Sequence, residues 1–226
     1  MDKTVQHLHK NLKPSFPKHF RLGFLGAGTI FFFLFAAFTL LVKTRTLRPF
    51  DFDMTVRLQN HLPIRFDDFL SFLSVTGRFE TSIVILLLIL IFHRKLMGFF
   101  AIAIFGIGHV IEIIGKNFLN QPGPPHMFLR TTTLSQNFPG LYIDTNDTYP
   151  SGHALRVVFL CVVIILILYR NKKLPAHFRY SIMGIVILYT LLMIISRVGL
   201  GEHWSTDVIG GSLLGASFGF FSLLLL

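Results

Sequence analysis

The segment LGFLGAGTIFFFLFAAFTLLV, residues 22–42, contains no charged residue and is flanked by Arg21 and Lys43. A helix that crosses the hydrocarbon core of a bilayer needs roughly 20 apolar residues, at about 1.5 Å of rise each. This segment meets that length, is too long for the apolar region of a signal peptide, and is followed by no convincing cleavage site. It therefore predicts a retained transmembrane helix and a membrane fold.

The composition of the chain indicates the same class. Of its 226 residues, 52% are hydrophobic and only 14% are charged, whereas a soluble domain has about 25% charged residues. The net charge is +10, but the cations lie in short clusters between apolar runs, which is typical of a membrane protein rather than a nucleic-acid-binding one. A single cysteine, Cys161, excludes an internal disulfide and a multi-thiolate metal site. A disordered protein and an ordinary cytosolic enzyme are excluded as well.

Five further spans are predicted, which gives an all-α, six-span transmembrane bundle. The second span ends at residue 92, and the other four cover residues 96–116, 151–169, 180–196 and 205–226. The second span is the shortest, because only residues 81–92 are free of charge. Between the first and second spans, residues 66–75 have apolar side chains at helical spacing, which predicts an amphipathic helix on the extracytoplasmic membrane surface. Residues 1–21 are expected to be a cytoplasmic tail, and residues 22–226 a single membrane-embedded domain.

The distribution of cations predicts the orientation. Lysine and arginine cluster in the N-terminal tail, at residues 94–95 and at residues 170–179. With six spans these three segments share one side, which the positive-inside rule makes cytoplasmic. We therefore expect a multi-pass cell-membrane protein with both termini in the cytoplasm. Residues 44–80 and the loop 117–150 then lie on the extracytoplasmic side.

Ionisable residues within membrane spans are costly and are therefore candidate functional groups. In the six-span arrangement, several such residues meet at the extracytoplasmic boundary. They lie at the outer ends of spans three to six: His109, Glu112, Lys116, His153, Arg156, Arg197, His203 and Asp207. Scattered structural polar residues would not share one membrane depth, so this agreement predicts a site.

The chemistry of this set suits an oxyanion such as phosphate. The cations supply positive charge, and the backbone N–H groups at the start of the fourth span supply aligned donors. Gly152 would allow the backbone to approach the ligand closely. His153 and His203 are candidates for the acid and the nucleophile of a phosphoryl transfer. Asp207 is placed to fix the tautomer of His203, and neither a metal ion nor a cofactor is expected.

These motifs resemble those of the type 2 phosphatidic acid phosphatase family, which is related in fold to the vanadium-dependent haloperoxidases. Residues 150–153, PSGH, match its central signature, and residues 196–207, SRVGLGEHWSTD, match its third signature completely. The first signature is Lys, six residues, Arg-Pro. Residues 116–124, KNFLNQPGP, match it except that Gly123 stands at the arginine position. The motif block covers residues 116–207.

The resemblance implies roles for individual residues. His203 would form a phosphohistidine, Asp207 would orient it, and His153 would protonate the leaving oxygen. The residues implied to hold the phosphoryl oxygens are Lys116, Ser151, Gly152 and Arg197. The implied activity is metal-independent hydrolysis of a lipid phosphate at the extracytoplasmic face.

Gly123 removes one charge-assisted phosphate contact, worth about 1.5–3 kcal/mol. Arg156 shares a helix face with His153 and is the nearest candidate replacement. Alternatively, Arg156 pairs with Glu112, whose expected depth is similar, or Arg130 supplies the missing charge. In either role Arg156 is expected to support the site.

The sequence thus predicts a metal-independent membrane phosphatase for a lipid phosphomonoester or polyprenyl diphosphate, such as phosphatidic acid, phosphatidylglycerol phosphate or undecaprenyl diphosphate. The expected partners are this lipid and the bilayer, with no nucleic acid. One alternative is a phosphotransferase that passes the phosphoryl group from a lipid donor to an acceptor lipid or sugar. The other is a non-catalytic lipid-binding membrane protein, which only Gly123 favours.

Two other patterns have structural interpretations. His109 and Glu112 are expected to be structural rather than catalytic. Gly211, Gly215 and Gly219 recur at four-residue spacing in the sixth span. Such spacing favours close helix packing, either within the bundle or in a homodimer.

Overall fold

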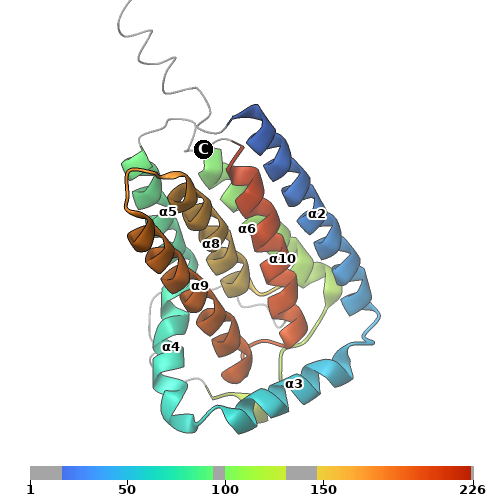
Figure 1. Ribbon diagram of the computed structural model, residues 1–226. Coiled ribbons are helices and arrows are strands. Elements are labelled where there is room, and N and C mark those ends of the chain that lie inside the picture. Colours follow the sequence, from blue (N-terminus) through green and yellow to red (C-terminus); the bar gives the residue numbers. More distant parts are fainter. Residues whose placement is uncertain (1–16, 94–99, 131–146, 225–226) are drawn as a thin grey trace, which may run out of the picture.

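The computed structural model describes residues 17–93, 100–130 and 147–224, and these residues contain no β-strand, which confirms the all-α prediction. The long helices are α2 (Lys18–Lys43), α5 (Phe79–His93), α6 (Phe100–Leu119), α8 (Gly152–Arg170), α9 (Ala176–Gly199) and α10 (Ser205–Ser222). The short helices are α3 (Arg48–His61) and α4 (Asp67–Thr76), with 3₁₀ turns η1 (Ile64–Phe66) and η3 (His126–Phe128). The long helices lie side by side, and α3 lies across the end of the bundle where α9 ends and α10 begins (Figure 1).

Among the described helices, four are long and apolar enough to span a membrane, or five if a bent helix pair is counted as one span. The predicted number of six is not confirmed. By length and composition, α2, α6, α8 and α9 are able to cross a membrane. Together, α4 and α5 meet the same criteria as one span bent by 57°. α10 does not meet them, because its 18 residues include Ser205, Thr206, Asp207 and four glycines. The sixth span therefore stays a prediction.

A helix does form where the amphipathic helix was predicted. α4 covers nearly the same residues and packs against α9. Leu70 and Leu73 are buried, whereas Phe69 and Phe72 are exposed. Apolar residues therefore occupy more than one face of α4, which fits its place in a bent apolar helix pair. Its position on a membrane surface stays a prediction.

α10 packs most extensively against α8 and α2, and its glycines make the approach to α8 possible. A Cβ atom at Gly211 would overlap the carbonyl oxygen of Ser151, and one at Gly215 would overlap that of Leu155. A Cβ at Gly219 would lie 3.0 Å from Val162 Cβ. The glycine stripe thus packs within the bundle, which is the first of the two arrangements that its spacing predicted.

α3 is bonded to the start of α10. The buried carboxylate of Asp51 accepts hydrogen bonds from the N–H and the hydroxyl of Thr206, at 2.8 and 2.7 Å. The first N–H groups of a helix have no partner within that helix, so Asp51 caps α10 from a neighbouring helix. Burial raises the pKa of Asp51, against the opposing effect of these hydrogen bonds. This contact fixes the segment on which His203 and Asp207 lie.

Arg130 joins the outer segments to one another. Its guanidinium forms hydrogen bonds of 2.8 and 3.0 Å with the Asp67 carboxylate. It also donates to the carbonyl oxygens of Gln59 and Leu62. Arg130 is therefore engaged in tying the segment after η3 to α3 and α4, and it does not supply the charge missing at Gly123.

Candidate active site

The residues predicted to form a site lie where α8 and α10 begin. The Ser151 N–H donates a 2.9 Å hydrogen bond to the Asp207 carbonyl oxygen, which joins the two segments that contain the candidate histidines. The rings of His153 and His203 lie within electrostatic range of each other. Histidines 50 residues apart in the chain are thus brought to one place.

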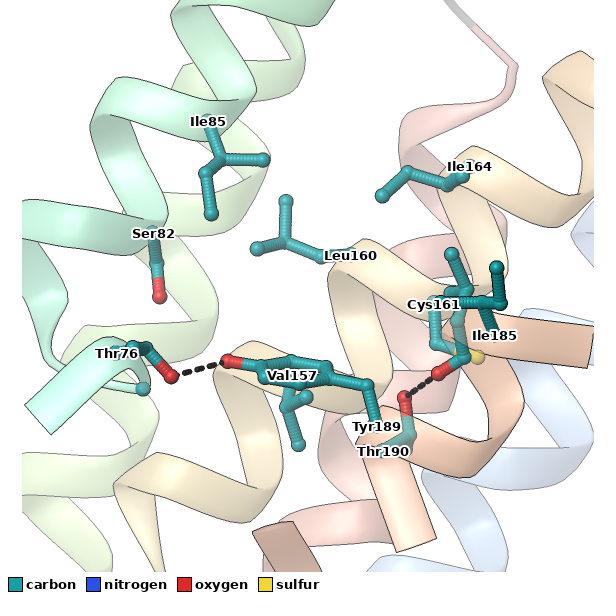
Figure 2. Close-up of a pocket in the computed structure, with 12 residues that line it drawn as sticks. Thr76, Ser82, Ile85, Val157, Leu160, Cys161, Ile164, Ile185, Tyr189 and Thr190 are labelled. Carbon is teal, nitrogen blue, oxygen red and sulfur yellow. Dashed lines mark hydrogen bonds between the residues drawn. The ribbon is translucent and has the colours of Figure 1, made fainter. Parts of the chain in front are cut away.

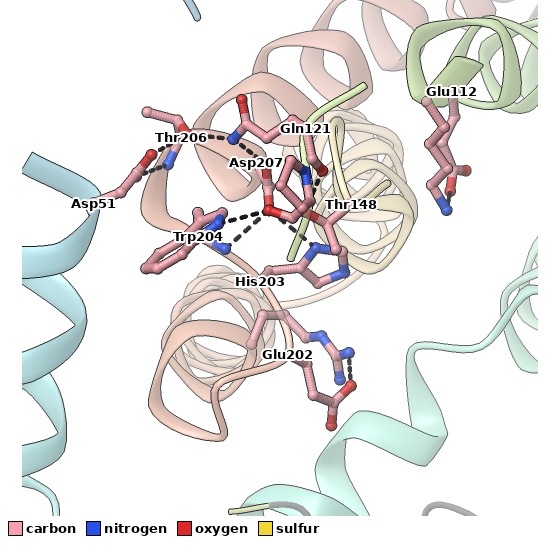
Figure 3. A network of polar contacts seen from close by, with 12 residues as sticks. Asp51, Glu112, Gln121, Thr148, Glu202, His203, Trp204, Thr206 and Asp207 are labelled. Atoms are coloured by element: carbon pink, nitrogen blue, oxygen red, sulfur yellow. Dashed lines mark hydrogen bonds and ion pairs between the residues drawn. The ribbon is translucent and has the colours of Figure 1, made fainter. Parts of the chain in front are cut away.

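Asp207 is fully buried, and its carboxylate is held from several sides (Figure 3). The Trp204 N–H and Gln121 Nε2 each donate to it at 2.9 Å, and the Thr148 hydroxyl also bonds to it. His203 Nδ1 lies 3.5 Å from Asp207 Oδ2, slightly beyond hydrogen-bond range. Catalytic hydrogen bonds often tighten only when substrate is bound. Because Asp207 faces Nδ1, the other ring nitrogen of His203, Nε2, is left for chemistry.

The environment of His203 keeps its ring neutral. Burial, together with the nearby cations of Arg197 and Lys116, holds the pKa of His203 well below its usual value of 6.5. A histidine with such a pKa is unprotonated at pH 7 and has a lone pair available for nucleophilic attack. The pKa of His203 therefore suits the nucleophile role.

Arg197 lies at the end of α9 and is almost completely buried. Its guanidinium contacts the carboxylate of Glu202 and the hydroxyl of Ser74 on α4. Its carbonyl oxygen accepts hydrogen bonds from the N–H groups of Glu202 and His203, both at 3.1 Å. This tight turn needs Gly201, whose φ is +71° and whose Cβ would overlap the Phe128 carbonyl oxygen. The turn therefore sets His203 directly against Arg197.

Ser151 precedes the first turn of α8. Its hydroxyl oxygen is buried and has no hydrogen-bond partner among the described residues. A buried hydroxyl without a partner is costly, and a helix N-terminus is a favourable place for an anion. The Ser151 hydroxyl and the first N–H groups of α8 are thus suited to bind phosphoryl oxygens.

The second predicted phosphate-binding cation, Lys116, lies in a cluster around Glu112. Lys116 Nζ is 3.1 Å from Glu112 Oε1, and Arg156 Nη1 is 3.5 Å from Oε2. His109 Nδ1 is 2.6 Å from Oε2. Arg156 also donates from Nε to the Gly77 carbonyl oxygen at 3.0 Å. Of the alternatives for Arg156, the structure thus forms the pair with Glu112.

Gly152 has a neighbour that the sequence did not predict. We expected its missing side chain to allow a ligand to approach the backbone. Instead, a Cβ at Gly152 would overlap the Glu112 carboxylate and lie 2.7 Å from Arg156 Nη1. Gly152 therefore makes room for the Glu112–Arg156 pair directly beside the first turn of α8.

Gly123, at the arginine position of the first signature, packs against Thr148. A Cβ there would lie 2.8 Å from Thr148 Cγ2. The Thr148 N–H donates to the Gln121 carbonyl oxygen at 3.0 Å, and an isolated bridge joins Pro122 to Asp147. This close approach holds the side chains of Gln121 and Thr148 on the Asp207 carboxylate. The sequence did not predict either residue as part of the site, because neutral polar residues in loops have no spacing signature.

An apolar cavity of about 260 Å³ adjoins the site between α5, α8 and α9 (Figure 2). Its wall is mostly aliphatic, and the hydroxyls of Thr76 and Tyr189 form a hydrogen bond of 2.8 Å across it. Gly77 lines this cavity, and a Cβ at Gly77 would lie 3.0 Å from His153 Cδ2. The cavity therefore extends to the glycine that lies against the His153 ring.

The apolar helices and their packing define a multi-pass helical membrane protein. Residues 95–226 match the model of the PAP2 superfamily, and the chain belongs to that family.

Two curated relatives have related sequences. The chain is 35% identical over 153 residues to an undecaprenyl-diphosphatase of Sulfolobus acidocaldarius. This match covers 67% of the chain and 66% of that protein. It is 29% identical over 127 residues to phosphatidylglycerophosphatase B of Bacillus subtilis, covering 55% of the chain and 56% of that protein. The matches thus span somewhat less than two thirds of the length of these relatives.

Two crystal structures have a similar fold. One is the transmembrane PAP2-type phosphatidylglycerolphosphate phosphatase of Bacillus subtilis, with a TM-score of 0.69 and 18% identity, covering 87% of this chain and 94% of that one. The other is LpxE of Aquifex aeolicus, with a TM-score of 0.56 and 22% identity, covering 76% and 93% of the two chains. At these identities the similarity shows the fold.

Proposed function

We propose that this chain is a membrane lipid phosphatase that uses His203 as its nucleophile and needs no metal ion. The observation that supports this most directly is the geometry of the His203 ring. Asp207 Oδ2 lies 3.5 Å from its Nδ1, and the pKa of His203 lies well below 6.5. His203 is thereby kept neutral, faces Asp207 through Nδ1 and lies in the field of nearby cations, which suits attack on a phosphoryl group.

The proposed binding step uses the groups around the start of α8. The buried Ser151 hydroxyl, which lacks a partner among the described residues, supports a phosphoryl site at this place. The residues that we assign to the phosphoryl oxygens are Lys116, Ser151, Gly152 through its backbone N–H, and Arg197, with Arg156 as supporting cation. Lys116 pairs with Glu112, and Arg197 pairs with Glu202. In the proposed binding step, donors of these two cations turn from the carboxylates to the phosphoryl oxygens.

The proposed reaction has two steps. First, His203 Nε2 attacks phosphorus, the bond from phosphorus to the leaving oxygen breaks, and His153, which enters the step protonated, gives its proton to that oxygen. Asp207 stabilises the positive charge that develops on the His203 ring. Second, water attacks the phosphohistidine while His153 takes a proton from it. The phosphorus–nitrogen bond then breaks, which releases phosphate and restores neutral His203.

The proposed substrate is a lipid with a terminal phosphate or diphosphate. The names of the curated relatives, an undecaprenyl-diphosphatase and a phosphatidylglycerophosphatase, support this class. The apolar cavity beside Gly77 supports it as well, because it offers an apolar surface next to the charged site. We place the first part of the lipid chain in that cavity, between α5, α8 and α9.

The proposed topology is a six-span bundle in the cell membrane with both termini in the cytoplasm. In this arrangement α10 is the sixth span, and residues 1–21 are a tail ahead of a single domain, 22–226. The site and residues 44–80, including the α4 helix, lie at the extracytoplasmic face. The clustering of cations in the tail and in residues 170–179 supports this orientation.

The activity is tested with purified protein in lipid nanodiscs. Phosphate release is measured from phosphatidic acid, phosphatidylglycerol phosphate and undecaprenyl diphosphate, with and without EDTA. We expect release from at least one of these lipids, unaffected by EDTA and abolished in His203→Ala while thermal unfolding stays unchanged. Complete loss of activity with EDTA, or an active His203→Ala protein, contradicts the proposal.

The same assay separates hydrolysis from phosphotransfer. The donor lipid is labelled with ³²P in its terminal phosphate, and candidate acceptor lipids and sugars are added. Hydrolysis predicts that the label appears as inorganic phosphate whether or not an acceptor is present. Label that appears on an acceptor instead would replace the phosphatase with a phosphotransferase.

A further inference from the structure

We infer that Glu112 is a positioning residue for the reaction, which holds Lys116 and Arg156 together beside the first turn of α8. This inference rests on the proposed function and deepens it. Glu112 lies outside the three signature motifs, so no motif assigns it a role in binding the phosphoryl group.

The first observation is that both oxygens of the buried Glu112 carboxylate contact basic side chains. Glu112 is 3% exposed. Oε1 contacts Lys116 Nζ at 3.1 Å, and Oε2 contacts His109 Nδ1 at 2.6 Å and Arg156 Nη1 at 3.5 Å. A carboxylate has about four acceptor positions, so one side chain is able to hold these three groups at once.

The second observation is where this cluster lies. The Glu112–Arg156 pair fills the space that a Gly152 side chain would occupy. Gly152 is the first residue of α8, and the N–H groups of a first helical turn are the natural donors to an anion. The cations that Glu112 contacts therefore lie close to those N–H donors.

The third observation concerns Arg156, which is fixed at two points. Its Nη1 faces Glu112, and its Nε donates to the Gly77 carbonyl oxygen at 3.0 Å. Gly77 also lies against the His153 ring. Arg156 thus has a defined position between Glu112 and the candidate general acid.

A lysine ammonium is a point charge on a flexible four-carbon stem with three donors. When one donor of Lys116 is held by Glu112, the ammonium group is fixed beside a carboxylate that itself lies against Gly152, the first residue of α8. The first signature lacks its arginine, at Gly123, and this arrangement supplies positive charge beside the first turn of α8, where we place the phosphoryl group. A positioned Lys116 and Arg156 thereby offset the loss of that arginine.

The test is a double-mutant cycle on Glu112 and Lys116. Wild type, Glu112→Gln, Lys116→Met and the double variant are compared in kcat/KM for the best lipid substrate and in inhibition by inorganic phosphate. If Glu112 acts through Lys116, Glu112→Gln lowers kcat/KM by about 10- to 100-fold in the wild-type background, which is the range expected for a charge-assisted hydrogen bond. In the Lys116→Met background its effect is at least about threefold smaller, because contacting residues are non-additive when one acts through the other, and the effect that remains comes through Arg156.

An equal fold-change in both backgrounds overturns the inference, because a residue that only supports the fold acts independently of Lys116. Thermal unfolding of all four proteins is measured in parallel. If Glu112→Gln does not fold, the cycle is run with Glu112→Asp, which keeps the charge but withdraws the carboxylate from Lys116. Asn117→Ala is the matched control: Asn117 is exposed and adjacent to Lys116, and we expect its effect to be negligible in both backgrounds.

Binding of inorganic phosphate separates this inference from the proposed function. Phosphate affinity is measured for the same four proteins by ³¹P NMR, which requires no turnover. If no lipid is hydrolysed but phosphate affinity shows the same non-additivity, the proposed activity fails and the inference holds. If lipids are hydrolysed and the cycle is additive, the proposed activity holds and the inference fails.

Discussion

The backbone N–H of Ser151 donates a 2.9 Å hydrogen bond to the carbonyl oxygen of Asp207. Ser151 lies two residues before His153, and Asp207 faces the ring of His203. One backbone hydrogen bond therefore sets the start of α8 and the first turn of α10 in a fixed relationship. The geometry of the histidine pair depends on this contact between helix ends rather than on contacts between the histidine side chains.

The first prediction concerns the ionisation of His203. Burial and the cations of Arg197 and Lys116 lower its pKa. As the pH falls from 7.5, His203 is therefore expected to stay neutral past pH 6.5 and to become protonated only below it. The loss of activity that comes from protonating the nucleophile is accordingly expected below pH 6.5. The pKa is measured by ¹⁵N NMR titration of labelled imidazoles, with His203→Gln to assign the signal.

Lys116→Met provides the control for the cause of this shift. Removing this one of the nearby cations is expected to raise the pKa of His203 while leaving it below 6.5, because burial is the largest cause. A midpoint at or above pH 6.5 in the wild-type protein contradicts the proposed electrostatics of the site.

The second prediction concerns the cap that α3 provides for α10. Asp51→Ala leaves the N–H and the hydroxyl of Thr206 buried without their acceptor. We expect the free energy of unfolding to fall by about 2–3 kcal/mol and kcat to fall as well, because Thr206 adjoins Asp207. Asp51→Asn is expected to cost less, since its amide oxygen still accepts one of the two bonds. Unfolding is measured in mixed detergent micelles.

Asp53→Ala is the matched control on the same helix. Asp53 pairs with Arg57 at 2.7 Å, but both side chains are more than half exposed. Exposed ion pairs contribute little to stability, so we expect Asp53→Ala to unfold like wild type. Equal effects of the two substitutions would show that Asp51 does not cap α10.

The residues that the sequence predicted for the site and those that it did not predict differ in the kind of signal they give. Lys116, His153 and Arg197 stand out because charge within apolar helices is costly and because they match motif spacings. Gln121 and Thr148 bond to Asp207 but give no such signal, because a neutral side chain in a loop is ordinary. Their role arises only when residues 121–123 and 147–148 meet.

The helices also differ in how clearly the sequence predicts them. The long apolar runs of α2, α8 and α9 are unambiguous in the sequence, because every residue contributes to hydropathy. α10 is harder to assign, because glycine and serine lower its hydropathy while serving to pack it against α8. Whether such a helix spans the membrane depends on its neighbours, and a local pattern contains no information about them.

The third prediction concerns the apolar cavity. Val186→Trp on α9 places a large ring in the cavity wall. We expect KM for a long-chain lipid phosphate to rise about tenfold, equivalent to about 1.4 kcal/mol, which is less than the burial of two methylene groups. A short-chain, water-soluble phosphate ester is expected to show unchanged kinetics. The readout is the ratio of kcat/KM for the two substrates.

Leu188→Trp is the control for the cavity variant. Leu188 lies on the same helix, is 57% exposed and does not line the cavity. Its substitution is expected to leave the ratio of the two kcat/KM values unchanged. If Val186→Trp also leaves that ratio unchanged, the lipid chain does not occupy this cavity.

The fourth prediction concerns the missing signature arginine. A Cβ at position 123 would lie 2.8 Å from Thr148 Cγ2, so Gly123→Arg requires Thr148 to move. Because the Thr148 hydroxyl bonds to Asp207, we expect Gly123→Arg alone to lower kcat/KM, by about tenfold for one weakened charge-assisted hydrogen bond. Adding the arginine that the family signature contains is thus expected to lower the activity of this protein.

Thr148→Ser provides the compensating change, because serine keeps the hydroxyl and lacks the methyl group that the new Cβ would meet. Thr148→Ser alone is expected to retain nearly full activity. The double variant, Gly123→Arg with Thr148→Ser, is expected to recover at least the kcat/KM of Thr148→Ser. Phosphate release by the four proteins is compared at equal amounts of folded enzyme. If the double variant is as impaired as Gly123→Arg alone, the methyl contact is not what excludes arginine from this position.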